Sequence, residues 1–390
     1  MDAHRHNWLV NTRVLYNFIS SIRLPHQPIA VEFLPELPGR REPAGDVAFC
    51  QLACGLRSEQ GEKVALYLLE VALPAQPISE EIRRYSKCLD YEGFPLPGYP
   101  EPMYQCITKA ELDCGIQSLK SHSYNDKCFL AAKQKDVFIF KLEGGVSEER
   151  DMKPLHTFQD HEEEGYGLAF HKVRPMLGSC SEDGRFNVWD VSELAPVYQF
   201  SSPVVLNSVE LLEHENQALV AAEDGHVLIM DLRQPVVAGK TAKVDSAVNT
   251  LTIHCVNTDI FASGTASGLW DIRKLDAPLS GIQAHDAAVI KLQFNHYFPM
   301  LIGSAAEDST VRVFDLEAPY SEDEDATPTN DEECDGEPIE LLFTHVGHRE
   351  HVYDFCWGTE ELTETYIASV GDDYGLQLWQ ITDDVLDFSA

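Results

Sequence analysis

Three histidines are each followed by an aspartate 22 to 25 residues later, a combination that can carry acid–base or metal chemistry. The pairs are His161 with Asp183, His285 with Asp308, and His348 with Asp373. An aspartate can orient a histidine as a general base, and both side chains bind zinc. A catalytic or metal-binding set occurs once in a chain, however, whereas this combination recurs. The recurrence favours a structural interpretation, in which each histidine hydrogen bonds toward an aspartate in a tight turn.

Other motifs of enzyme chemistry are missing from the sequence. It contains no glycine-rich phosphate loop, no metal triad and no GxSxG nucleophile elbow, and GSCSEDG at 178–184 has the composition of a turn. The ten cysteines form no CxxC pair, although Cys50 and Cys54 are four residues apart. We therefore predict a non-enzyme with no metal and no cofactor, in a reducing compartment. With no signal-peptide pattern and no long apolar run, we expect a soluble intracellular protein.

A repeated strand pattern must position the histidines and aspartates. Each unit ends in alternating apolar residues, closed by a bulky residue and usually by Asp. These endings are VFIFK (137–141), FNVWD (186–190), VLIMD (227–231), GLWD (268–271), VRVFD (311–315) and LQLWQ (376–380). Their bulky residues are spaced by 49, 41, 40, 44 and 65 residues. A period of about 40–45 residues is that of WD-repeat blades, the four-stranded sheets of a β-propeller.

Turns fall where each unit needs a tight hairpin between its second and third strands. They are SEDG (181–184), AEDG (222–225), AEDS (306–309) and GDDYG (371–375). The N-terminal third adds a hairpin, 46–55 with 63–73, and a lone strand, IAVEFLP (29–35). We predict an all-β, seven-bladed WD-repeat β-propeller over 28–390, provided that an N-terminal strand completes the last blade. The unit that ends at Trp270 is short, so its hairpin should be tight or distorted.

Residues 4–23 follow helical rather than alternating spacing, and they are predicted to form a helix within a lead-in at 1–27. One apolar face suits docking on the propeller and consists of Trp8, Leu15, Ile19 and Ile22. A second ridge consists of Val10, Val14 and Phe18. Either a loop covers this ridge, or it is an apolar strip that binds a partner.

An insertion at 317–340, before the last blade, is strongly acidic. Nine of the seventeen residues at 321–337 are Asp or Glu. A run of like charges cannot collapse, so we predict that the first half is disordered. The second half leads into the apolar strand at 339–345, which places acidic side chains beside Leu342 and Phe343. Such a rim suits a basic amphipathic helix lying in a groove, with arginine as the preferred ligand.

The net charge of −35 narrows the class of partner. An acidic surface repels nucleic-acid phosphates and anionic membranes, and it accelerates the encounter with basic proteins. We therefore expect no direct contact with nucleic acid and none with a membrane. That the acidic residues only provide solubility remains an alternative.

Four segments resemble the retinoblastoma-associated histone-binding WD-repeat proteins. They are WLVNTRVLYNFISSIRLP…IAVEFLPE, DHEEEGYGLAFH, SEDGRFNVWDVS and DGEPIELLFTHVGH…VYDFCW. The resemblance covers 5–385 and is weakest over 75–125. Its specific features are the N-terminal helix and the acidic loop before LLF…HxGH, whereas the repeat is common to WD proteins. Members of that family are small subunits of chromatin assembly factor and of histone acetyltransferase and deacetylase complexes.

The resemblance implies a groove for the first helix of histone H4, between the N-terminal helix and the acidic loop. The helix wall would consist of Val14, Leu15 and Phe18. The floor would consist of Leu342 and Phe343, although Thr344 replaces an apolar residue. A histone arginine would face Glu332 and Asp335.

The resemblance also implies a site on the flat end of the propeller, which takes basic tails such as that of histone H3. The residues that match the family there are Glu164, Tyr166, Asn249 and Asp372. Acidic residues or an aromatic residue of the family are replaced here by Pro25, Gly115, Ala288 and Ile290. Asn207 occupies a position where the family usually has Glu. Each lost carboxylate or ring should weaken cation binding by about 1–3 kcal/mol. We therefore predict a weakened tail site.

These features predict a non-catalytic histone chaperone and scaffold. The expected partners are histone H4, the H3–H4 pair and larger subunits of chromatin assembly, remodelling, deacetylase or acetyltransferase complexes. The expected location is the nucleus, with the cytoplasm as a second one. The alternative is a generic WD-propeller adaptor, for a ubiquitin ligase or in ribosome assembly. An enzyme is the third class, and the missing motifs argue against it.

Overall fold

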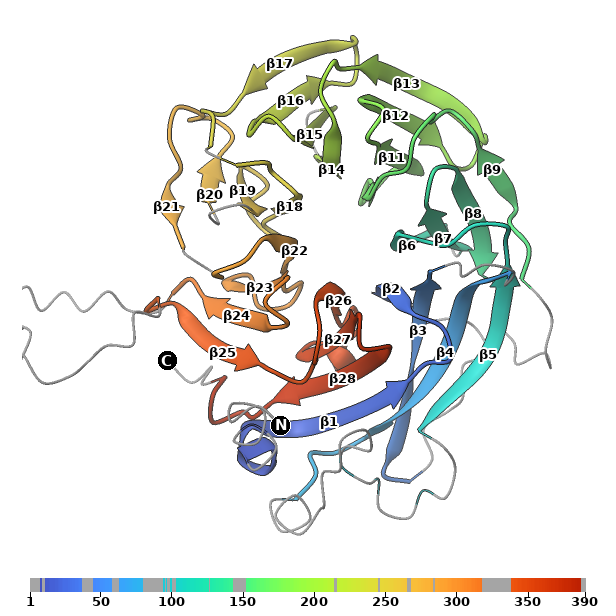
Figure 1. Cartoon of the computed structure of the whole chain (residues 1–390), viewed down its shortest axis with the longest axis vertical. Coiled ribbons are helices and arrows are strands. Elements are labelled where there is room, and N and C mark those ends of the chain that lie inside the picture. The colour runs from blue at the N-terminus through green and yellow to red at the C-terminus, as the bar shows by residue number, and fades with distance from the viewer. Residues whose placement is uncertain are drawn as a thin grey trace, which may run out of the picture.

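Seven four-stranded antiparallel sheets form a ring in the computed structural model (Figure 1). The structure describes residues 8, 11–36, 45–57, 63–79, 94, 96, 99, 103–125, 127–142, 152–213, 216–244, 246–264, 268–282, 285–317 and 338–386. Each sheet is one blade, and the blades are numbered here in chain order. The predicted seven-bladed β-propeller is confirmed.

In each of the first four blades, the strands follow one another in chain order from the centre of the ring outward. Blade one consists of β2 (Pro28–Phe33), β3 (Val47–Leu56), β4 (Val64–Pro74) and β5 (Tyr104–Glu111). Blade two consists of β6 (Ser118–Tyr124), β7 (Lys127–Lys133), β8 (Val137–Leu142) and β9 (His156–Phe158). Blade three consists of β10 (Gly167–Phe170), β11 (Met176–Cys180), β12 (Arg185–Asp190) and β13 (Ala195–Ser201). Blade four consists of β14 (Leu206–Leu211), β15 (Gln217–Ala222), β16 (Val227–Asp231) and β17 (Val236–Lys240).

The last three blades complete the ring. Blade five consists of β18 (Thr250–Ile253), β19 (Ile260–Gly264), β20 (Gly268–Asp271) and β21 (Ser280–Gly281). Blade six consists of β22 (Val289–Phe294), β23 (Leu301–Ala306), β24 (Val311–Asp315) and β25 (Leu341–His345). Blade seven consists of β26 (Val352–Trp357), β27 (Tyr366–Gly371), β28 (Gly375–Ile381) and β1 (Tyr16–Arg23), with a short 3-10 helix at Glu361–Thr363.

The core of the molecule lies between neighbouring blades. The inner strands line a central channel and contact one another around the ring (Figure 1). Alternating apolar residues on the strands pack against the next sheet, as β-branched and aromatic side chains favour. Four indoles are fully buried in this way: Trp189, Trp270, Trp357 and Trp379.

An N-terminal strand closes the ring, as the seven-blade prediction required, but it is not the lone strand at 29–35. Strand β1 pairs antiparallel with β28, from Tyr16 opposite Ile381 to Arg23 opposite Gly375. The segment at 29–35 supplies β2 instead, the innermost strand of blade one, where it pairs with β3 of the predicted hairpin. The closing strand was misplaced because β1 had been interpreted as part of a helix.

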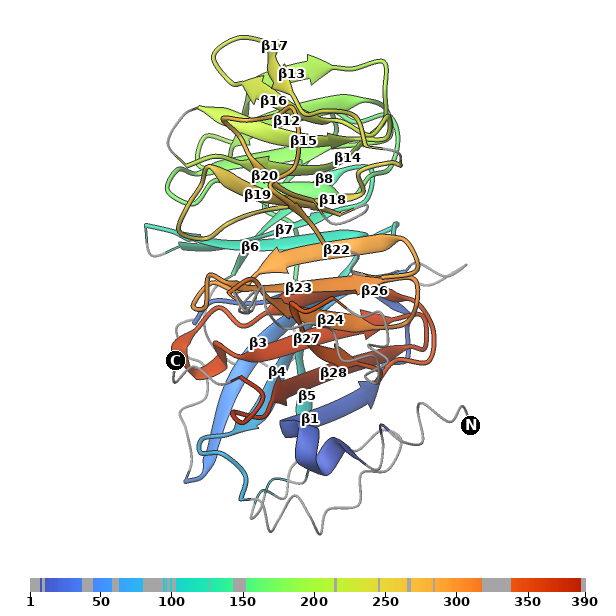
Figure 2. The same ribbon diagram turned by 90° about the vertical axis from the view of Figure 1, so that its left-hand side faces the viewer.

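The predicted helix at 4–23 is wrong over Tyr16–Arg23, which form β1. Among the described residues of that range, only Trp8 and residues 11–15 are helical. The side view shows this short helix beside β1 and β28 (Figure 2). Both faces of β1 are covered, since Phe18 and Ile19 point to opposite sides and are both buried. No polar alternation therefore marks the strand, and pairing with β28 decides its structure. The boundary predicted after residue 27 consequently falls inside the propeller.

Phe94, between β4 and β5, and Tyr104, the first residue of β5, cover the outer edge of β1. The main-chain nitrogen of Phe94 donates to the carbonyl oxygen of Ile19 over 2.8 Å. The hydroxyl of Tyr104 donates to the carbonyl oxygen of Ser20 over 3.2 Å. The ring of Phe94 is fully buried. An edge strand covered in this way is protected from pairing with another chain.

The predicted tight turns are present in blades three, four, six and seven. The turn residues Gly184, Gly225, Ser309 and Tyr374 have positive φ angles. A Cβ atom on Gly184 would lie 2.3 Å from the carbonyl oxygen of Ser202, so this turn requires glycine. The expected distorted hairpin of blade five falls at 265–267, and the predicted disorder at 318–337, both outside the described residues. No helix in the described part of the chain has the length and apolar character needed to span a membrane.

Candidate functional site

The three predicted His–Asp pairs are hydrogen bonded in blades three, six and seven. The distances between histidine Nδ1 and an aspartate oxygen are 3.3 Å for His161 and Asp183, 2.7 Å for His285 and Asp308, and 3.2 Å for His348 and Asp373. Each histidine Nε2 also bonds to a hydroxyl on the second strand of its blade, from Ser179, Ser304 and Ser369. The order resembles a hydrolase triad, but all three serines are fully buried and no substrate can reach them. The predicted structural role of the pairs is confirmed.

Burial shifts the pKa of the histidine in the blade-three pair, His161 with Asp183. Burial, and after it the nearby Lys133 ammonium, lower the pKa of His161 to about 4. Lys133 is itself fully buried, and burial lowers its pKa to about 8. Asp183 accepts hydrogen bonds from the main-chain nitrogens of Glu162 and Arg185, each over 2.8 Å. The neutral imidazole therefore joins the turn to the strand that precedes it.

The free energy of unfolding should fall as the pH drops from about 6.5 to about 4. In this range the unfolded state binds a proton at His161 that the folded state does not, at about 1.4 kcal/mol per pH unit. Urea unfolding at several pH values measures the slope, which should be shallower in His161→Gln. An equal slope in both proteins would contradict the assignment. Asp373 acts in a separate pH range. Burial raises the pKa of its carboxyl, but the interactions with His348 and the hydrogen bonds from the main-chain nitrogens of Arg349 and Gly375 together outweigh burial and lower this pKa to about 2, so its contribution is lost only below about pH 3.8.

A series of buried hydrogen bonds fixes the N-terminal residues against β25. Trp8 Nε1 donates to the Tyr16 hydroxyl over 2.8 Å, and that hydroxyl lies 2.7 Å from His345 Nδ1. His345 Nε2 lies 3.0 Å from Gln377 Oε1, and its ring stacks on Trp379 with centroids 4.3 Å apart. Because Gln377 Oε1 only accepts, His345 carries its proton on Nε2 and Tyr16 donates to Nδ1. The N-terminal residues are thereby held beside the strand that follows the acidic insertion.

The residues predicted for a groove divide between surface and core. Val14 is 71% exposed, whereas Leu15 and Leu342 are half-buried against the same core cluster. Phe343 is buried, with its ring 5.3 Å from that of Tyr16. It supports the surface from below rather than lining it. We call Val14, Leu15 and Leu342 the N-terminal apolar surface.

The placement of Phe18 in a helix wall is wrong. Strand β1 turns this side chain inward, where it is fully buried with its ring 5.8 Å from that of Tyr366. Thr344 is half-buried beside Phe343. Glu332 and Asp335, predicted to face a histone arginine, lie outside the described residues. Sequence analysis also missed Tyr16 and His345, for which the only signal was a polar group in an apolar segment that would need a buried partner.

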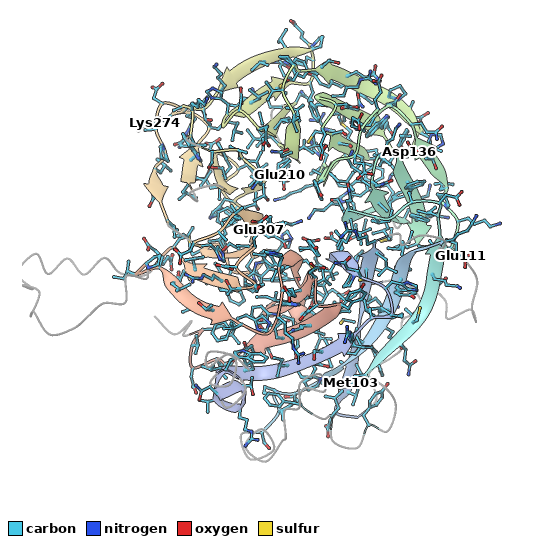
Figure 3. All side chains as sticks on the ribbon, in the orientation of Figure 1. Met103, Glu111, Asp136, Glu210, Lys274 and Glu307 are labelled. Atoms are coloured by element: carbon cyan, nitrogen blue, oxygen red, sulfur yellow. The ribbon has the colours of Figure 1, made fainter. Side chains whose placement is uncertain are left out.

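The innermost strands of the blades all begin at the same end of the central channel. At this end the channel opens into a cavity of about 720 Å3, which we call the near mouth. Its lining includes three of the predicted tail-site residues, Glu164, Tyr166 and Asn249, and also Glu307 (Figure 3). Of the five residues that differ from the family's pattern, the lining includes Gly115, Asn207, Ala288 and Ile290, but not Pro25. Asp372 lies outside the lining, and its carboxylate accepts a hydrogen bond from the Gln27 side chain.

Three carboxylates of the near-mouth lining, those of Glu164, Glu223 and Asp354, are already hydrogen bonded or paired within the protein. Glu164 accepts from Gln117 Nε2 over 2.5 Å and from Gln134 Nε2 over 2.6 Å. Glu223 accepts from Asn207 over 2.8 Å, and Asp354 pairs with Lys291 over 3.0 Å.

The near mouth also holds a cation that sequence analysis missed, Arg57, which donates to Gln27 Oε1 over 3.3 Å. Tyr166 remains exposed and free to stack on a ligand. A cationic ligand would therefore compete with side-chain amides for the carboxylates, and it would also meet the guanidinium of Arg57.

Two stretches of the chain match a known repeat family. Residues 152–190 and 277–315 match the family described as WD domain, G-beta repeat. They contain the His–Asp turns of blades three and six. The propeller therefore contains WD repeats.

This WD-repeat protein is similar over nearly its whole length to curated proteins. It is 24% identical to histone acetyltransferase type B subunit 2 of Candida glabrata, over 99% of this chain and 90% of that protein. It is 26% identical to WD-40 repeat-containing protein MSI3 of Arabidopsis thaliana, over 97% and 89%. It is 25% identical to histone acetyltransferase type B subunit 2 of Kluyveromyces lactis, over 96% and 90%. The resemblance to the retinoblastoma-associated histone-binding WD-repeat family is confirmed by these relatives.

The described part of this WD-repeat protein offers no cluster for a metal ion. No three His, Cys, Asp or Glu side chains gather there in a suitable arrangement. The His–Asp pairs are completed by serine hydroxyls, which are structural partners in a buried hydrogen-bond network.

Proposed function

We propose that this WD-repeat protein is a non-catalytic histone-binding scaffold, which binds the first helix of histone H4 on the N-terminal apolar surface. The observation that carries the proposal is the docking of Trp8 and Tyr16 on His345 of β25, with Val14 exposed on the short helix between them. A basic amphipathic helix has the complementary chemistry, because it offers apolar side chains to Val14 and Leu342 and arginines to the acidic segment.

The names of the relatives support the wider part of the proposal. Two of them are named as subunits of a histone acetyltransferase, so we infer that this chain joins larger histone-modifying or chromatin-assembly complexes. The net charge of −35 favours a basic partner such as histone H4 or the H3–H4 pair. Such work places the protein in the nucleus, with the cytoplasm as a second location.

Reversing two charges in the acidic insertion tests the proposal. A peptide of the first H4 helix should bind the unmodified chain, more weakly as salt rises, because exposed charge attraction is screened. Glu332→Lys with Asp335→Lys should abolish this binding in calorimetry while the melting temperature changes little. Reversing Glu193 and Asp224, exposed acids of other blades, is the matched control. Equal affinity in both double variants would remove the insertion from the interface.

A histone H3 tail peptide should bind the near mouth weakly or not at all. Glu164 already accepts two amide hydrogen bonds, and Arg57 places a positive charge where the tail would bring its own. Fluorescence polarisation at physiological salt measures the affinity. Low-micromolar binding that Tyr166→Ala abolishes would show that the remaining carboxylates and Tyr166 suffice.

A further inference from the structure

One cation of the near mouth has no carboxylate as its partner. Arg57 follows β3, and its main-chain nitrogen donates to the carbonyl oxygen of Gln27 over 2.8 Å, just before the inner strand β2 begins. This hydrogen bond holds Arg57 at the end of the channel where the near mouth opens. Arg57 is exposed there, and among the described residues no carboxylate lies within ion-pair distance of its guanidinium.

A neutral amide fixes the guanidinium of Arg57. Its Nη1 donates to Gln27 Oε1 over 3.3 Å, and the amide nitrogen of Gln27 donates to the Asp372 carboxylate of blade seven. Gln27 is buried, so these two hydrogen bonds join the loop after β3 to blade seven. A guanidinium has five N–H donors, and the described residues accept from one of them. Because its partner is uncharged, the guanidinium is fixed in the lining without being neutralised.

The guanidinium lies near the exposed aromatic ring of the near mouth. Burial and the carboxylates of Glu182 and Glu164 raise the pKa of Tyr166, whereas the Arg57 guanidinium lowers it. Tyr166 and Arg57 line the same cavity, and Tyr166 is 55% exposed. Arg57 is therefore within electrostatic reach of the ring on which a cationic ligand would stack.

Without Arg57, the lining would attract a cation. Asp354 pairs with Lys291 over 3.0 Å, so these two residues together add no net charge. Glu164 and Glu223 accept hydrogen bonds from neutral amides, which leave their negative charges in place. Glu307 adds a third carboxylate beside the channel (Figure 3). Three carboxylates around an exposed aromatic ring suit a guanidinium or an ammonium group.

We propose that Arg57 sets the ligand specificity of the near mouth, because it excludes the cationic side chains that the carboxylates would otherwise bind. A ligand arginine stacked on Tyr166 would bring a second guanidinium close to that of Arg57, and like charges brought together at a binding site are costly. Arg57 cannot lose its proton to relieve this repulsion. Basic ligands are thereby directed to the N-terminal apolar surface. The inference rests on the proposed histone binding only for its choice of ligand.

Removing the charge of Arg57 tests the inference. Arg57→Gln keeps a donor for Gln27 but removes the positive charge, so it should raise the affinity of the H3 tail peptide at least about tenfold in fluorescence polarisation. Arg57→Lys keeps the charge and should bind the tail as weakly as the unmodified chain does. Arg273→Gln, at an exposed arginine of blade five outside the lining, is the matched control for net charge and should leave the affinity unchanged.

Two further measurements show whether the gain arises in the near mouth. Tyr166→Ala in the Arg57→Gln background should remove the gain, because the ligand loses the ring on which its arginine stacks. A tail peptide with its arginines and lysines changed to glutamine should bind Arg57→Gln no better than the unmodified chain, because Arg57 does not repel an uncharged ligand.

Three results would overturn the inference. They are an Arg57→Gln protein that binds the tail no better than the unmodified chain, an equal gain in Arg57→Lys or Arg273→Gln, and a gain that persists without Tyr166. The melting temperature should change little in the Arg57 variants, because the side chain is exposed. Affinity for the H4 peptide should be the same in all of them, so failure here is distinguishable from failure of the proposed function.

Discussion

Replacing Phe18 by Asp should prevent the ring from closing and unfold most of the protein at room temperature. Phe18 is fully buried on β1, the strand that completes blade seven. Deleting a buried phenylalanine side chain costs about 3–5 kcal/mol, and an unpaired carboxylate in its place costs more. The total stability of a domain is about 5–15 kcal/mol. Circular dichroism and thermal melting measure the loss directly.

Two matched variants separate this effect from a general effect of the N-terminus. Phe18→Leu keeps an apolar side chain and should lower the melting temperature only moderately. Val14→Asp places the same charge four residues earlier on an exposed position, and should leave the melting curve almost unchanged. A folded Phe18→Asp protein with an unchanged melting temperature would contradict the placement of Phe18 in the core.

Val14→Asp should instead destroy the binding of the H4 helix while the protein stays folded. Val14 is the most exposed member of the N-terminal apolar surface, and it lies on the short helix between Trp8 and Tyr16, which are held against His345. Losing an apolar anchor at an interface costs at least about 2 kcal/mol, or about thirtyfold in affinity. The substitution also replaces the apolar side chain that the ligand would contact by a charged one. Calorimetry with the H4 peptide measures the change.

Val197→Asp is the control for this variant, since it adds the same charge to an exposed valine of blade three. It should bind the H4 peptide as the unmodified chain does. If both variants lose the same affinity, the effect is one of net charge and not of a local contact. If neither loses affinity, the N-terminal apolar surface is not the site.

The repeat was predictable because its signals are local. The turn at Gly184 needs a positive φ that glycine supplies, and endings such as FNVWD close an apolar run with a bulky residue and Asp at a regular interval. Strand β1 gave no such signal. Its neighbours Phe18 and Ile19 are both buried, so the strand has no polar face, and its partner β28 lies at the other end of the chain. Pairing at that distance is a tertiary property, which spacing along 4–23 cannot reveal.

The site was only partly predictable for a related reason. Val14 is exposed and Leu342 is half-buried, so both lie at or near the surface, but whether a side chain faces outward depends on the element that carries it. Phe18 lies in the core because the residues around it form a strand and not the predicted helix. Arg57 was missed because its role at the near mouth arises from Gln27, which lies thirty residues earlier. The hydrogen bond of Tyr16 to His345 spans 329 residues and has no counterpart in local sequence.

The pairing of β1 with β28 sets the order in which the protein can be completed during synthesis. The first strand to leave the ribosome must wait for the last one, because Tyr16 faces Ile381 across the seam. Blades one to six can form as they emerge, while the apolar side chains of β1 have no sheet to join. The covering residue Phe94, which bonds to Ile19, is available far earlier than β28 and can shield the waiting strand. In a nascent chain, β1 should therefore gain protease resistance in one late step, when the final strand becomes available and after the other blades have formed.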